Sequence, residues 1–137
     1  MHSRKLYGAG LGFRRELIPE LEAGVPEAVR FFELAPENWA GMGGRSARQL
    51  RSFTERYPFV CHGLSLSVGG QRPLDTDLLR RTRAFMAEHG IGLYTEHLSW
   101  SSDDGQLYDL LPLPCTGEAV RWAAARIRQA QEVLGCR

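Results

Sequence analysis

The sequence lacks long apolar stretches and any excess of charge of one sign. No stretch approaches the roughly 20 apolar residues that a membrane-spanning helix needs. Seventeen lysines and arginines are balanced by 16 aspartates and glutamates, for a formal charge of +1. This balance provides no field to attract nucleic acid or an anionic membrane, so we expect neither partner. Met1 to Lys5 lack the apolar run of a secretory signal, and we expect a soluble, cytoplasmic protein.

Cysteine is also scarce, with three residues in the chain. Cys61, Cys115 and Cys136 form no CxxC pair, so the sequence suggests neither a zinc knuckle nor a disulfide framework. We expect reduced thiols with no disulfide among them, and we interpret Cys61 as a packed core residue. His62 follows it directly, but neighbouring residues of a strand point to opposite faces, which argues against a Cys–His nucleophile.

Apolar, β-prone runs alternate with helical patterns along the 137 residues, a length that suits one domain. The β-prone runs are Leu6 to Phe13, Phe31 to Ala35, Phe59 to Cys61 continuing toward Val68, and Ile91 to Trp100. The helical patterns are Arg45 to Tyr57, Asp75 to Glu88, Gly117 to Leu134 and a weaker one, Arg14 to Glu22, in which Pro19 can break the helix. The alternation predicts an α/β fold with four parallel strands in chain order, covered by helices.

Polar residues gather where these strands end, and the carboxyl ends of parallel strands are where α/β proteins place their ligand sites. They are Glu33, Glu37, Asn38, His62, Glu96 and His97. His62 and His97 hold equivalent places in successive strand–helix units, and adjacent strands lie about 4.8 Å apart. Their imidazoles are therefore able to share one metal ion, with carboxylates alongside that suit ferrous iron.

Other interpretations of these residues stay open. Each histidine could merely hydrogen-bond within the core. The glycine-rich turn from Gly63 to Gly69 could cradle phosphate, although no GxGxxG or Walker pattern is present. His89 lies in the last turn of a predicted helix, where the helix dipole favours a cation, and we do not expect it to bind metal.

Five segments together resemble a known family. They are Gly8 to Arg14 (GAGLGFR), Glu33 to Asn38 (ELAPEN), Tyr57 to Gly69 (YPFVCHGLSLSVG), Thr95 to Trp100 (TEHLSW) and Asp109 to Pro114 (DLLPLP). In this order, the chain from about Tyr7 to Gly135 resembles the multinuclear non-heme iron-dependent oxidative enzymes, a family that includes the iron-containing subunit of the methanobactin-forming oxidase.

The resemblance implies a TIM-type (β/α)₈ barrel, related to the xylose-isomerase-like barrels, with two or three irons at its carboxyl-terminal rim. It implies an enzyme that uses O₂ to modify cysteines of ribosomally made precursor peptides, helped by a partner protein that holds the peptide's leader. His62 and His97 match the family's iron ligands. Five further residues match its motifs or lie beside them, and we expect them to line the site: Glu33, Glu37, Asn38, Glu96 and Asp109.

A complete barrel needs about 250 residues and eight βα units, whereas four units are predicted here. We interpret residues 1–137 as the N-terminal half of such a barrel, a fragment or truncated copy that is inactive alone. We expect its open strand edges to cause self-association or to bind a complementary half. Two alternatives remain: a non-catalytic binding or vestigial module, and a divalent-metal sugar isomerase or endonuclease of the same barrel superfamily.

Overall fold

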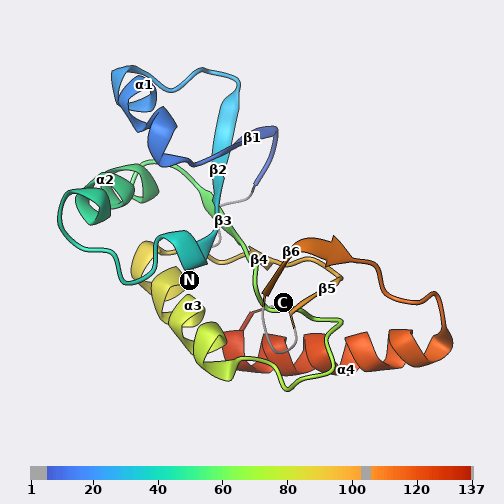
Figure 1. The fold of residues 1–137 in the computed structure, drawn as a ribbon. Helices are drawn as coiled ribbons and strands as arrows, with labels where there is room; N and C mark the ends of the chain where they lie inside the picture. The colour runs from blue at the N-terminus through green and yellow to red at the C-terminus, as the bar shows by residue number, and fades with distance from the viewer. Residues whose placement is uncertain (1–5, 103–105, 137) are drawn as a thin grey trace.

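The computed structural model describes residues 6–102 and 106–136, which contain a four-stranded sheet, helices and a separate hairpin (Figure 1). The strands of the sheet are β1 (Ala9–Gly12), β2 (Val29–Leu34), β3 (Phe59–His62) and β4 (Tyr94–Thr95). The hairpin consists of β5 (Trp100–Ser102) and β6 (Gln106–Leu111). The helices are α1 (Ile18–Ala23), α2 (Gly44–Thr54), α3 (Thr76–His89) and α4 (Gly117–Leu134), with short 3₁₀ turns η1 (Arg15–Leu17) and η2 (Pro36–Asn38).

The sheet has the strand order β1-β2-β3-β4, and every neighbouring pair within it is parallel. This confirms the predicted α/β fold with parallel strands in chain order. The carboxyl ends of all four strands consequently lie at the same end of the sheet. At this end His62, the last residue of β3, lies next to Thr95, the last residue of β4.

The core lies between the sheet and its helices and is rich in phenylalanine. Phe32 of β2 and Phe53 of α2 are fully buried. The Phe13 ring centroid lies 5.0 Å from that of Phe53, and the centroid of Phe59 lies 5.3 Å from that of Phe32. Removing one such ring typically costs about 3–5 kcal/mol, so this cluster holds β2 and β3 firmly. Alternate residues of these strands point to the opposite face.

Two helices begin and end within one residue of their predicted bounds. The Asp75 carboxylate accepts a hydrogen bond from the N–H of Leu78 at 2.8 Å and caps α3, and Gly90 ends that helix with a left-handed φ of 66°. The Thr116 hydroxyl caps α4 in the same way, through the N–H of Ala119. None of the helices in the described part of the chain combines the length and apolar character that a membrane crossing requires.

The predicted strand from Ile91 to Trp100 is wrong in its second half. The chain leaves the sheet after Thr95, and Trp100 instead begins the hairpin, where β5 pairs antiparallel with β6. The loop after β3 holds the segment in its new direction. The Gly69 N–H donates to the carbonyl of Ser99 at 2.8 Å, and the Ser67 hydroxyl accepts the N–H groups of Ser101 and Ser102 at 3.0 and 3.1 Å.

Pro19 begins a helix instead of breaking one. The weak pattern from Arg14 to Glu22 divides into η1 and α1, and Pro19 lies in the first turn of α1. A proline at that place loses no helical hydrogen bond, because first-turn N–H groups have no partner within the helix.

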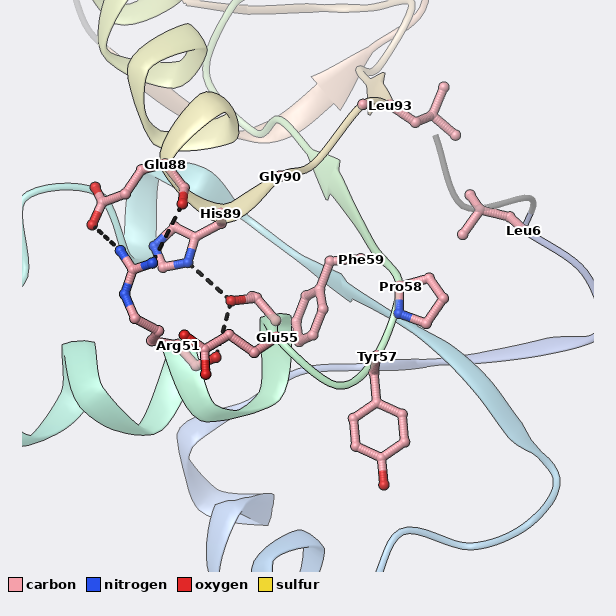
Figure 2. A pocket seen from close by; sticks show the side chains of 12 residues that line it. Leu6, Arg51, Glu55, Tyr57, Pro58, Phe59, Glu88, His89, Gly90 and Leu93 are labelled. Carbon is pink, nitrogen blue, oxygen red and sulfur yellow. Dashed lines mark hydrogen bonds and ion pairs between the residues drawn. The ribbon is translucent and has the colours of Figure 1, made fainter. Parts of the chain in front are cut away.

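A polar cluster lies at the opposite end of the strands, where α2 and α3 terminate (Figure 2). Arg51 pairs with Glu88 at 2.7 Å, and the Nδ1 atom of His89 lies 3.1 Å from the Thr54 hydroxyl. The sequence predicts a charged His89, but burial lowers the pKa of this imidazole below its ordinary value, and the nearby Arg51 lowers it further against the opposing effect of Glu88. Desolvation here outweighs the attraction of the Glu88 carboxylate.

His89 therefore makes stability depend on pH. Its folded pKa lies below its unfolded value of about 6.5, so its contribution is present above that value and is lost as the pH falls through the folded pKa. Between pH 7.5 and 5, we expect urea denaturation to show a larger loss of stability for the wild type than for His89→Asn. An equal loss in both proteins would contradict the assignment.

Candidate metal centre at the strand ends

The parallel register of β3 and β4 places His62 beside Thr95. The two residues are Cα partners, and the Nδ1 atom of His62 lies 2.7 Å from the Thr95 hydroxyl oxygen. His97 comes two residues after the end of β4, where the chain turns away from the sheet. Its imidazole points back toward β3, so the side chains of His62 and His97 meet although they follow two different strands.

The two imidazoles face each other directly. The Nε2 atom of His62 lies 3.2 Å from the Nε2 atom of His97, and the ring planes meet at 70°. Two nitrogens bound at ~2.1 Å to one ion lie ~3.0–3.4 Å apart when they subtend 90–110° at it. The separation thus fits a single metal ion held by both rings. The structure brings the predicted pair together.

The described residues place no third typical metal ligand with these two histidines. Within residues 6–102 and 106–136, no group of three or more His, Cys, Asp or Glu side chains is arranged to hold a metal ion. The described residues thus offer two imidazole ligands, and an ion bound there needs water or other donors to complete its coordination.

Glu96 lies behind His97 with its side chain 9% exposed. Its Oε2 atom accepts the Tyr94 hydroxyl at 2.9 Å, and its Oε1 atom accepts the N–H of His97 at 2.8 Å. The same Oε1 lies 3.4 Å from the Nδ1 atom of His97. Burial and the adjacent Glu96 charge hold the pKa of Tyr94 well above its usual range, so the phenol stays protonated as a donor.

Glu37 makes its hydrogen bond to the loop after β3 and not to either imidazole. Its Oε1 atom accepts the N–H of Leu64 at 2.8 Å, and its buried Oε2 atom has no hydrogen-bond partner among the described residues. It lines a groove that also includes Ala40, Ser65 and residues of α3. Glu37 therefore supports the loop after β3 in this structure, and it does not contact the histidines.

A hollow of about 600 Å³ opens at the rim beside the two imidazoles. Of the residues predicted for the site, it is lined by Glu33, Asn38, His62 and His97. Glu37 and Glu96 are not among its lining residues, and Asp109 is exposed on β6, also outside that lining.

The sequence prediction missed several residues of this region. Arg14 and Arg15 line the hollow, and the Arg15 guanidinium lies 5.2 Å from the centre of the Trp39 ring and donates to the carbonyl of Asn38. Thr95 and Tyr94 contact the site through their hydroxyls. Hydroxyl residues carry no ligand signal of their own, but the register that aligns Thr95 with His62 follows from the parallel sheet.

Cys61 is a packed core residue, as predicted. It is fully buried, and burial, helped by the charge of Glu37, raises the pKa of its thiol to about 12. A thiol with that pKa is almost entirely un-ionised at neutral pH, which excludes it as a nucleophile there. In the structure Cys61, Cys115 and Cys136 are all free.

A second hollow, of about 310 Å³, lies at the opposite end of the strands (Figure 2). Its principal polar side chains already pair with one another, Arg51 with Glu88 and His89 with Thr54. It is the weaker candidate, because active sites of parallel α/β proteins lie at the carboxyl ends of the strands.

Residues 8–137 match the family described as the RiPP precursor modification enzymes MbnB/TglH/ChrH, where RiPP denotes a ribosomally made, modified peptide. A UPF0276 protein of Nitrosospira multiformis is 62% identical over 130 residues, which make up 95% of this chain and 46% of that protein. A UPF0276 protein of Pseudomonas aeruginosa is 58% identical over 127 residues, 93% of this chain and 45% of its own length. The chain thus spans about half the length of these relatives.

The lack of a side chain at Gly63 allows the Glu96–Tyr94 pair to pack against the backbone next to His62. A β-carbon at this position would collide with the Tyr94 hydroxyl and with the Oε2 atom of Glu96. We expect Gly63→Ala to reduce the free energy of unfolding by about 1–3 kcal/mol, the usual cost of overpacking, as measured by urea denaturation. Gly24→Ala is the matched control, since nothing lies within 4 Å of a β-carbon there. Equal stability of the two variants would contradict this packing.

Proposed function

Because this chain belongs to the family of RiPP precursor modification enzymes MbnB/TglH/ChrH, we propose that it is part of an iron-dependent oxidase. The enzyme uses O₂ to oxidise cysteine residues of a ribosomally made precursor peptide. In this proposal His62 and His97 bind iron, and the partners are the precursor peptide and a protein that holds its leader. A (β/α)₈ barrel is the proposed fold of the whole enzyme.

The single observation that carries the proposal is the 3.2 Å separation of the two Nε2 atoms. At this separation one cation bound to both rings is within bonding distance of each Nε2 atom. Imidazole suits iron, and the carboxylates of Glu33 and Glu96 nearby favour a ferrous ion electrostatically. The buried Nδ1 atom of His97 has no hydrogen-bond partner among the described residues, and the Glu96 carboxylate lies 3.4 Å from it.

Ferrous iron, when bound, supplies the one-electron chemistry that allows O₂ to oxidise a thiol. The residues of this chain have other tasks. The hollow of about 600 Å³ beside the histidines falls in the size range of small-ligand sites and suits a peptide side chain. Trp39, buried at its wall, excludes water on that side. Arg14 and Arg15 line the hollow together with Glu16 and Glu33, so its wall offers charges of both signs to a polar peptide.

Activity is proposed for the whole enzyme and not for residues 1–137 alone. The chain covers 46% and 45% of the length of two relatives, and a cluster of two or three irons needs more ligands than two histidines. Each missing ligand lowers the affinity for metal. We therefore infer weak, exchangeable metal binding by this chain and no oxidase activity without the remaining ligands.

Metal titration tests the site in the chain itself. We expect anaerobic titration with Co²⁺, a spectroscopic substitute for Fe²⁺, to give visible absorption bands from bound metal. His62→Ala and His97→Ala should each weaken binding at least about tenfold, since each removes half of the protein ligands. His89→Ala is the matched control, because this imidazole lies at the opposite end of the strands. Undiminished binding by the double His62→Ala, His97→Ala variant would contradict the site.

A full-length relative tests the reaction. Elemental analysis of the anaerobically purified protein should find iron, and the equivalent double histidine variant should lose it together with peptide-dependent O₂ consumption. Zinc, manganese or magnesium in place of iron would favour the isomerase or endonuclease alternative. A metal-free protein that still bound peptide would favour a non-catalytic module.

Open strand edges support a further part of the proposal. Among the described residues, β1 pairs only with β2 and β4 only with β3, and Leu98 beyond β4 is 63% exposed. Unpaired edges and exposed apolar side chains recruit other chains. We expect the 137-residue chain to self-associate at micromolar concentration in sedimentation velocity experiments, or to bind a complementary half of the barrel. A compact monomer that binds no such half would contradict this.

A further inference from the structure

We propose that Thr95 and Glu96 are positioning residues that set the tautomers of the two histidines. Each places the ring proton on Nδ1 and leaves Nε2 bare. The inference rests on the proposed metal site and adds how that site is prepared before an ion arrives. Thr95 acts on His62 from the end of β4, and Glu96 acts on His97 from the next position in the chain.

The hydroxyl of Thr95 has two neighbours that define its direction. Its oxygen lies 3.4 Å from the carbonyl oxygen of Cys61 and 2.7 Å from the Nδ1 atom of His62. A carbonyl only accepts, and we assign the hydroxyl hydrogen to that of Cys61. The hydroxyl oxygen is then left to accept, and the Nδ1 atom of His62 must supply the proton.

Glu96 gives His97 the same tautomer by a different route. Its carboxylate only accepts, and three donors hold it in place: the Tyr94 hydroxyl at 2.9 Å, the N–H of His97 at 2.8 Å and the N–H of Leu66 at 3.4 Å. Its Oε1 atom lies 3.4 Å from the Nδ1 atom of His97. That separation is long for a hydrogen bond, but the carboxylate charge still favours a proton on Nδ1 over a bare lone pair.

The consequence is a chelating pair that is prepared in advance. With both ring protons on Nδ1, the two Nε2 lone pairs face each other across 3.2 Å. A proton on either Nε2 atom would leave the Nδ1 atom of that ring bare, beside the Thr95 hydroxyl oxygen or the Glu96 carboxylate. The arrangement stores mutual repulsion that a divalent cation relieves, and oriented ligands of this kind typically raise metal affinity by about 10–100-fold.

The tautomers are read directly by long-range ¹H–¹⁵N NMR of the 15.4 kDa chain at pH 8, where imidazoles are neutral. In the metal-free wild type we expect His62 and His97 both to carry the proton on Nδ1. Thr95→Val, which removes the hydroxyl but keeps the shape, should move the His62 proton to Nε2 and weaken Co²⁺ binding by about tenfold. Thr95→Ser should restore both properties. Glu96→Met should affect His97 in the same way and leave His62 unchanged.

Thr54→Val is the matched control, because Thr54 contacts the Nδ1 atom of His89 at 3.1 Å as Thr95 contacts His62. It should alter His89 and leave His62 and Co²⁺ binding as they are. A wild-type His62 protonated on Nε2, or a Thr95→Val variant with unchanged tautomer and affinity, would overturn the inference even if iron binds. The expected tautomers without any metal binding would instead sustain it and refute the proposed iron site.

Discussion

The parallel pairing of β3 with β4 is the constraint on which the rim depends. It makes His62 and Thr95 Cα partners, and it brings the next residues of the chain, Glu96 and His97, within reach of His62. A shift of this register by one residue would turn one of the two strands over. Thr95 would then no longer face His62, and the 3.2 Å approach of the two imidazoles would be lost.

The two faces of the sheet differ in what they contact: one packs in the core, and the other faces the hollow at the rim. Phe32, Phe59 and Cys61 point into the aromatic core and anchor β2 and β3. The alternate residues, among them Glu33 and His62, face the hollow at the rim. Packing on one face fixes where the strands end, and it thereby fixes the positions of the polar groups at the rim.

Much of this arrangement could be predicted because it is encoded by local pattern and strand order. The caps of α3 and α4 are readable in the sequence, and parallel strand order alone brings His62 and His97 to one rim. The hairpin was missed because the apolar run from Ile91 to Trp100 continues across the point where the chain leaves the sheet. That departure is held by the N–H groups of Ser101 and Ser102, which donate to the hydroxyl of the distant Ser67. The orientation of Glu37 depends likewise on a nonlocal N–H, that of Leu64.

The central claim is that His62 and His97 hold one divalent ion between their Nε2 atoms. The most direct measurement is a crystal structure of the chain grown anaerobically with Fe²⁺, with anomalous difference density recorded at the iron edge. The account predicts one peak ~2.1 Å from both Nε2 atoms, with Thr95 and Glu96 still on the two Nδ1 atoms. Iron density only at another place, or no ion between the two rings in a crystal grown with excess Fe²⁺, would contradict this claim.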